Sequence, residues 1–266
     1  MTNLHTLASG SSGNALLLSC GETHLLLDAG ISCRRILKSL EALGLTAADL
    51  DAILITHTHG DHISGLATLI KRCQAPIYAS EATARGLAYR VAGIEPLLRP
   101  FVPGAALSIG DCRITTFPNS HDAEGATGYR LDTADGGVGL LTDSGCVTEE
   151  AAEALPGVDL MVLEANHDVE TLRSGPYPYH LKKRILGEEG HLSNEDAAAF
   201  AVTLAESGTS QFVLAHLSRE NNTPAMAFNA VERSLSAAGL SPALSVAPRD
   251  DLSPAHTVER RAVCRR

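Results

Sequence analysis

Tryptophan is absent from the 266-residue sequence, and there are only five tyrosines and five phenylalanines. The core must therefore be built from aliphatic side chains, for which a hydrophobic content of 44% is sufficient. No apolar run approaches the ~20 residues that a membrane-spanning helix needs. The N-terminus has no basic stretch followed by an apolar segment, so no signal peptide is predicted and we expect a cytoplasmic protein with no membrane partner.

Paired cysteines and positive charge are also scarce. None of the six cysteines belongs to a C-x-x-C motif, and in a chain this long we expect small buried residues rather than a disulfide framework. The 31 acidic residues outnumber the 21 lysines and arginines, which gives a formal net charge of −10. This balance argues against a protein that coats nucleic acid through its overall charge, but it allows a nuclease with a local basic patch.

The most informative segment is 52–62, where an apolar run that predicts a short buried strand ends in three histidines and an aspartate. Imidazole and carboxylate groups are the ligands that suit Zn²⁺ and similar ions. His57 and His59 are two apart on an extended segment and can point to one side, whereas Asp61 and His62 follow a glycine turn. The spacing predicts two neighbouring metal ions, one bound by each pair. A polar turn with incidental histidines is the alternative.

The run THTHGDH at residues 56–62 resembles the signature of the metallo-β-lactamase fold superfamily. The resemblance implies an α/β fold, a four-layer αββα sandwich of two mixed β-sheets flanked by helices. It also implies further ligands, because His121, Asp143 and His216 each follow a predicted strand and match later metal motifs of the superfamily. Asp122, beside His121, is a weaker candidate.

The implied ligand set binds two divalent ions that share one carboxylate, since the two oxygens of a carboxylate can bridge. One ion would be bound by His57, His59, His121 and Asp143, and the other by Asp61, His62, Asp143 and His216. Asp28, at the end of the predicted strand 24–27, matches an aspartate that supports the metal loop without binding metal. Mixed nitrogen and oxygen donors suit Zn²⁺, Mn²⁺ or Fe²⁺, of which we expect Zn²⁺ or Mn²⁺.

A small polar loop at residues 9–14 lies between the predicted strands 4–8 and 15–19. Its backbone N–H groups and hydroxyls can contact a phosphate, and a flexible hairpin turn is the alternative. The residues predicted to bind substrate in this loop are Ser9, Ser11, Ser12 and Asn14.

The rest of the chain shows no break in composition that would mark a linker. Helices are predicted at 32–43 and from a Ser80 cap to about residue 90, and apolar residues near helical period follow the metal loop at 63–72. Residues 1–247 are predicted to form a single domain. The Pro-, Asp- and Arg-rich stretch 248–266 is predicted to be a frayed tail, with a phosphate-binding tail as the alternative.

The region between Asp143 and His216 indicates a branch of the superfamily. Residues 190–198 resemble the H-[ST]-x-x-x-A element of the tRNA-processing RNase Z enzymes, in which a histidine assists phosphodiester cleavage and a glutamate orients it. His191 and Glu164 match those two positions. The alternative for His191 is a structural residue at a helix entry.

The segment 173–184 interleaves basic and aromatic residues, a composition that suits a phosphate backbone and stacked bases, although a solvated helix start is the alternative. Its predicted substrate-binding residues are Arg173, Lys182, Lys183 and Arg184. With residues 7–14, 166–168 and 190–197, the chain resembles the bacterial YycJ (WalJ) proteins over about 4–247. That resemblance implies 5′-to-3′ exonuclease activity on DNA. No inserted β-CASP domain and no long tRNA-holding arm are evident in the sequence.

The predicted function is thus a dinuclear-metal phosphodiesterase, a DNA exonuclease in which a metal-bridging hydroxide attacks phosphorus. Asp61 would orient the hydroxide, and His191, held by Glu164, would stabilise developing charge or protonate the leaving oxygen. The alternative is a thioester or lactone hydrolase like the glyoxalase II group, which would not need His191 or the basic segment. A regulatory binding module with structural metals is a third interpretation, and an intact ligand set with open positions argues against it.

Overall fold

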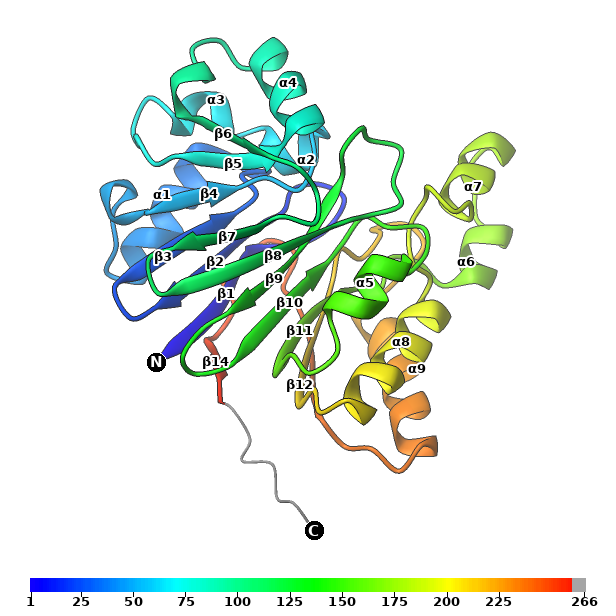
Figure 1. Cartoon of the computed structure of the whole chain (residues 1–266). Helices are drawn as coiled ribbons and strands as arrows, with labels where there is room; N and C mark the ends of the chain where they lie inside the picture. The colour runs from blue at the N-terminus through cyan, green and yellow to red at the C-terminus, as the bar shows by residue number, and fades with distance from the viewer. Residues whose placement is uncertain (260–266) are drawn as a thin grey trace.

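The computed structural model describes residues 1–259, and two seven-stranded β-sheets form its central layers (Figure 1). Sheet A contains, in spatial order, β14 (His256–Val258), β1 (Thr2–Ala8), β2 (Ala15–Cys20), β3 (Thr23–Leu27), β4 (Ala52–Leu54), β5 (Ile77–Ser80) and β6 (Leu98–Phe101). Sheet B contains β13 (Ala243–Val246), β12 (Gln211–Ala215), β11 (Leu160–Glu164), β10 (Gly137–Leu141), β9 (Thr127–Asp132), β8 (Cys112–Pro118) and β7 (Ala106–Ile109). Each sheet mixes parallel and antiparallel neighbours.

Helices cover the outer face of each sheet. Sheet A is covered by α1 (Cys33–Ala42), α3 (Leu66–Leu69) and α4 (Glu81–Arg90), and sheet B by α5 (Glu149–Ala154), α8 (Asn194–Glu206) and α9 (Pro224–Ala237). The short helix α2 (Gly60–Ile63) follows β4, and two 3₁₀ turns span Ala47–Asp49 and Glu95–Leu97. On the sheet B side, α6 (Val169–Ser174) and α7 (Tyr179–Ile185) project outward (Figure 1). These four layers confirm the predicted metallo-β-lactamase fold.

The side chains of each leucine-rich strand pack in two buried layers, one on each face of the sheet. In β2, Leu16 and Leu18 pack between the sheets, whereas Leu17 packs beneath the helices of the outer face. Successive side chains of a strand point to opposite faces, and both faces are covered here, so the strand is continuously apolar. Pairing of β2 with β3 sets Leu18 opposite Leu25 and Leu17 opposite Leu26, which keeps each layer in register.

The helix predictions hold where a serine cap was readable. Ser32 accepts a hydrogen bond at the start of α1, and Ser80 does the same for α4. The segment 63–72 is not one helix, because the chain turns between α2 and α3 at Gly65. A Cβ at Gly65 would lie 2.0 Å from the carbonyl oxygen of Ile31, so glycine is required for this close approach.

The prediction of a frayed tail at 248–266 is wrong for residues 248–259. The strand β14 pairs antiparallel with β1 and covers an edge that would otherwise be unpaired. Ser253 accepts a hydrogen bond from the Thr6 N–H at 2.9 Å, and Val258 is buried. The remaining residues of the predicted tail, 260–266, lie outside the described residues. Within residues 1–259, none of the helices combines the length and apolar character that crossing a membrane requires.

Parallel strands of both sheets end at one edge of the sandwich. Side chains that follow β4, β10 and β12 come within ligand distance of one another at this edge. In open α/β sheets, the carboxyl ends of the strands are where loops present binding groups on a rigid scaffold. This edge therefore positions the candidate site.

Candidate metal centre

Three residues at this edge have a left-handed backbone although none is glycine. Asp28, Asp143 and His216 have φ values of 61°, 57° and 56°, and each directly follows β3, β10 or β12 within two residues. Non-glycine residues adopt this conformation at an energetic cost, and they persist where the surrounding structure holds them. This backbone conformation turns each side chain away from the strand direction and toward the other residues at this edge.

All seven predicted metal ligands meet there. Their donor atoms fall into overlapping groups in which every atom lies within 4.8 Å of the others: His57, His59 and His121; His57, His62 and Asp143; and Asp61, His62 and His216. Asp143 is central, since its carboxylate lies 3.2 Å from His62 Nε2, 3.5 Å from His216 Nε2 and 3.8 Å from His121 Nε2. This central place is the one that a bridging carboxylate needs.

The unsatisfied atoms and charges of the cluster fit divalent cations. Among the described residues, His57 Nε2 is buried without a hydrogen-bond partner, and Asp143 Oδ2 also lacks one of good geometry. Such atoms are costly to leave unpaired, and a bound ion would satisfy both. Burial lowers the pKa of His216, but the carboxylates of Asp143, Asp61 and Glu164 raise it to about 10. The same negative field favours a cation in place of that proton.

Asp28 supports the cluster through contacts with Thr56 and His62. Its carboxylate accepts hydrogen bonds from the Thr56 N–H at 2.9 Å and from the Thr56 hydroxyl, and it lies 2.7 Å from His62 Nδ1. His62 Nε2 therefore faces Asp143. A metal-binding histidine usually has its second nitrogen fixed by such a partner. Asp28 makes the contacts that its predicted supporting role requires.

Glu164, the last residue of β11, holds two histidines with one oxygen. Its Oε1 lies 2.9 Å from His191 Nδ1 and 2.8 Å from His216 Nδ1, while Oε2 accepts from the N–H groups of Ser144 and Leu192. Burial raises the pKa of Glu164, but the histidines, His191 first, lower it to about 2. An ionised carboxylate only accepts hydrogen bonds, so both histidines carry a proton on Nδ1 and present Nε2 to the site.

Sequence reasoning paired Glu164 with His191 and missed its contact with His216. The contact follows from strand register, because Glu164 lies opposite Ala215 in the parallel pair of β11 and β12. His216 is the next residue along. Which strand neighbours β11, and in which register, has no signal in a single sequence.

Asp122 also makes contacts that the sequence analysis did not predict. Its Oδ1 lies 3.5 Å from His121 Nε2 and 3.8 Å from His59 Nε2, and its other oxygen accepts from Arg184 Nε. His59 turns its Nδ1 inward, 3.2 Å from His121 Nε2. Burial raises the pKa of Asp122, but Arg184 and His121 bring it below the ordinary value, so the carboxylate is ionised. Asp122 thus lies between the outer nitrogen of His59 and a guanidinium.

The loop at 9–14 contacts the cluster in a different way from that predicted. Ser9 and Asn14 are buried. The Ser9 hydroxyl accepts from the His216 N–H at 2.8 Å, and the Asn14 amide bonds Gly10 and lies 3.1 Å from His62 Nε2. Their side chains are committed to internal contacts, and substrate binding by these two residues stays a prediction. Ser11 and Ser12 are exposed.

The predicted basic residues of α6 and α7 are mostly engaged as well. Arg173 pairs with Glu170 at 3.3 Å, Arg184 pairs with Asp122, and Lys182 donates to the carbonyl groups of Arg173 and Gly175. Within residues 1–259, only Lys183 of the predicted set has no ion pair and no side-chain hydrogen bond. The four residues lie together as predicted, but they do not present four uncommitted charges.

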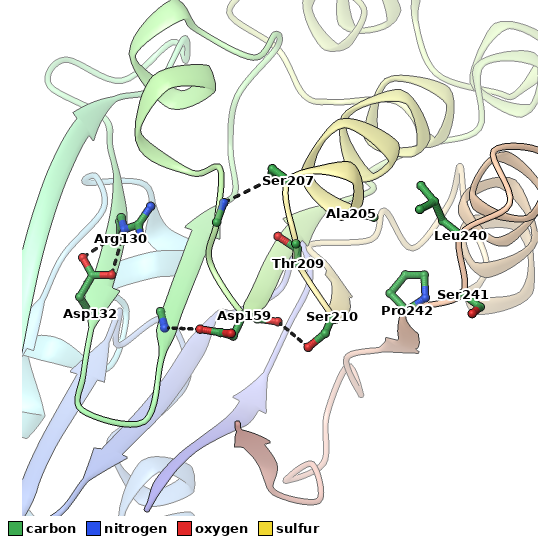
Figure 2. Close-up of a pocket in the computed structure, with 13 residues that line it drawn as sticks. Arg130, Asp132, Asp159, Ala205, Ser207, Thr209, Ser210, Leu240, Ser241 and Pro242 are labelled. Atoms are coloured by element: carbon green, nitrogen blue, oxygen red, sulfur yellow. Dashed lines mark hydrogen bonds and ion pairs between the residues drawn. The ribbon is translucent and has the colours of Figure 1, made fainter. Parts of the chain in front are cut away.

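A hollow of about 650 Å³ lies at the opposite end of sheet B (Figure 2). Asp159 lines it just before β11 begins, whereas Glu164 ends that strand at the metal cluster. Arg130 in this hollow is tied to Asp132, and Asp159 caps the Gly137 N–H. None of the predicted site residues lines it. The chemistry therefore points to the cluster rather than to this hollow.

Comparisons with known proteins agree with this architecture. Residues 23–217 match the family described as "Beta-lactamase superfamily domain". The chain is 40% identical over 237 residues to "Exodeoxyribonuclease WalJ" of Streptococcus pneumoniae, covering 88% of each protein. It is 37% identical over 235 residues to "Exodeoxyribonuclease YycJ" of Bacillus anthracis, covering 88% of this chain and 89% of that one. The metallo-β-lactamase fold protein YhfI of Bacillus subtilis shares the fold, with a TM-score of 0.71 at 18% identity over 96% of this chain and 100% of its own.

Proposed function

This chain belongs to the β-lactamase superfamily and, within it, to the family of the WalJ and YycJ proteins, and on that premise we propose that it is a metal-dependent DNA exonuclease. The observation that carries the proposal is the position of His191. Its imidazole is held by Glu164 beside the ligand cluster and is still 18% exposed. A group so placed can reach a substrate, and metal binding alone would not require it.

The seven clustered residues would bind two divalent ions, Zn²⁺ or Mn²⁺, with Asp143 shared. When bound, the two ions supply an activated water and neutralise charge on the scissile phosphate. Asp61 lies at the mouth of the cluster, with 23% of its side chain exposed, and is 3.4 Å from His216 Nε2. From there its carboxylate can orient the attacking water toward the phosphorus.

His191 would act on the other side of the reaction. Glu164 holds the proton on Nδ1, so Nε2 is the nitrogen that meets substrate. In its protonated form, Nε2 can donate to the leaving oxygen or to the charge that develops on the phosphate. The glutamate fixes the orientation of the ring.

Asp122 would orient His59 electrostatically from 3.8 Å, a looser contact than the 2.7 Å between Asp28 and His62. Arg184 fixes Asp122 in turn, so its proposed role changes from substrate contact to support of the cluster. Each of the two ions would then have one histidine oriented by an aspartate. The helix α7 is tied to the cluster through the same pair.

The proposed direction of digestion, 5′ to 3′, follows from the family resemblance of residues 7–14, 166–168 and 190–197. The test is a time course on single- and double-stranded DNA and RNA, labelled at either end, with Zn²⁺ or Mn²⁺ present. We expect nucleotides to be lost from the 5′ end of DNA. Early loss of the 3′ label would overturn the direction. Rapid thioester or lactone hydrolysis with no cleavage of nucleic acid would overturn the nuclease.

A further inference from the structure

The helices α1 and α3 lie on the sheet A flank of the molecule, away from α6 and α7 (Figure 1), and basic residues lie on α1 and follow α3. We call this group the α1–α3 basic surface, and it consists of Arg34, Lys38, Lys71 and Arg72. All four are exposed. Arg34 and Lys38 are four residues apart on α1 and share one face of the helix.

The surface is hollowed rather than flat. A depression of about 540 Å³ is lined by Arg34 and Lys38 of α1 and by Arg72, which follows α3. The hollow also contains Thr68, the apolar side chains of Cys33 and Leu37, and a single carboxylate, Glu41. Three cations and one carboxylate give it a positive charge within a chain of net charge −10.

These cations have no internal partner. In the described part of the chain, none of the four forms an ion pair or a side-chain hydrogen bond. Arg173, Lys182 and Arg184 on the other flank are all engaged with Glu170, backbone carbonyls or Asp122. Like charges gathered around a hollow repel one another unless an anion is present. The structure thus places four uncommitted cations on α1 and just after α3, whereas α6 and α7 carry one, Lys183.

The helices that carry this surface begin at the metal loop. A Cβ at Gly30, three residues before α1, would lie 1.6 Å from the carbonyl oxygen of Asp61. Gly65, just before α3, donates its N–H to Ala29 in the same connection. Both helices therefore start against the backbone that carries the proposed ligands. Arg34 lies in the first turn of α1, four residues after Gly30.

A further cation, Arg249, lies beside the 9–14 loop, which contacts the metal cluster. Arg249 Nη1 is buried and has no hydrogen-bond partner among residues 1–259. It lies beside the 9–14 loop, 2.9 Å from where a Cβ of Gly10 would be, and Ser9 donates its N–H to the Arg249 carbonyl. The next residue, Asp250, pairs with Arg35 of α1 at 3.5 Å. The segment 249–250 thus connects the loop at the cluster to α1 through side chains of alternating charge.

We propose that the α1–α3 basic surface binds the phosphate backbone of the nucleic acid beyond the nucleotide being removed. The inference rests on the proposed nuclease function and names the path of its substrate. An acidic protein repels DNA at long range, so contacts must be local. Each neutralised phosphate of a single strand contributes about −0.7 to the slope of log affinity against log salt. Removing three of these cations should therefore change that slope by roughly 2.

The test compares the triple variant Arg34→Gln, Lys38→Gln, Arg72→Gln with a control of equal charge change. The control is Arg90→Gln, Arg113→Gln, Arg233→Gln, three exposed residues elsewhere on the surface. Cleavage of a single-stranded 20-mer and of a dinucleotide is measured with the metal-loaded enzymes at several salt concentrations. The dinucleotide contains only the cleaved bond and does not extend to the surface.

For the 20-mer at low salt, we expect the triple variant to raise KM roughly tenfold or more and to flatten the salt dependence. Its kinetics on the dinucleotide should match those of the wild type, and the control should resemble the wild type on both. If the two variants have equal KM and equal salt slope on the 20-mer, the proposal that this surface binds nucleic acid is wrong, and the proposed nuclease function is unaffected.

Failure of the proposed function gives a different result. If the wild type cleaves neither oligonucleotide, the nuclease proposal fails. Binding of a fluorescently labelled 20-mer would then still test whether the α1–α3 basic surface contacts nucleic acid. Weaker binding by the triple variant alone would then support the surface. No binding by the wild type would overturn both. Salt-dependent binding of anionic lipid vesicles in place of DNA would also overturn the inference.

Discussion

Replacing Glu164 with glutamine should disturb three properties at once, because four donors converge on its carboxylate. Oε1 faces His191 and His216, and Oε2 faces the N–H groups of Ser144 and Leu192. Glutamine has one accepting oxygen and one NH₂ group that only donates. Either orientation of the amide therefore leaves two donors facing a donor in a site with no exposure to solvent.

The expected magnitudes follow from those contacts. Two unsatisfied buried donors should lower the free energy of unfolding by about 2–6 kcal/mol. Loss of the partner that orients His216 should weaken binding of one metal ion roughly 10–100-fold. Loss of an oriented His191 should reduce turnover roughly 10²–10⁴-fold. Glu170→Gln is the matched control, since Glu170 is exposed and pairs only with Arg173; its stability should change by at most about 0.5 kcal/mol.

Three assays separate these effects. Urea denaturation of the metal-free proteins gives stability, competition with a chelator gives metal affinity, and release of nucleotides from DNA gives turnover at saturating metal. If Glu164→Gln lowers turnover but leaves the affinity of both metal ions unchanged, the shared oxygen does not position His216. In that case the account of Glu164 as a link between ligand and catalytic histidine is refuted.

Three further predictions concern neighbouring residues. His191→Ala should retain both metal ions by elemental analysis and lose roughly 10²–10⁴-fold in phosphodiester turnover, and unchanged turnover would remove it from the mechanism. Asp122→Asn should lower the affinity for the metal ion bound near His59 roughly 10–100-fold, as measured by competition with a chelator. An unchanged affinity would show that Asp122 does not orient His59. In the metal-free protein the pKa of His216 is about 10, so at pH 8 this histidine holds a proton that a metal ion must displace. Metal affinity should therefore rise with pH up to about that pKa, and calorimetry in buffers of different ionisation enthalpy should detect proton release, whereas metal binding at pH 8 without proton release would contradict this.

The proposed ligands were readable from sequence because each follows an apolar strand. His57, His121 and His216 come just after predicted strands, and a strand's end fixes where the next side chain lies. The sheets themselves were readable from their continuous apolar runs. The strand β14 was not, since three residues carry no periodic pattern and their pairing with β1 depends on the rest of the fold.

Whether a polar side chain is available to substrate was not readable. Ser9, Asn14, Lys182 and Arg184 have the right chemistry for phosphate binding, yet in the fold each contacts an internal partner. Those partners lie far away in the sequence or depend on loop conformation. The same limitation hid the availability of Arg34, which shows only once α1 and α3 are placed together.

The central claim is that two metal ions on this cluster carry a nuclease activity. The most direct measurement adds Zn²⁺ or Mn²⁺ stepwise to metal-free protein and follows bound metal and nucleotide release from DNA in the same sample. We expect activity to develop as the ratio approaches two ions per chain, and we expect Asp143→Asn neither to retain two ions nor to become active. Full activity at one ion per chain, or in the metal-free protein, would contradict it.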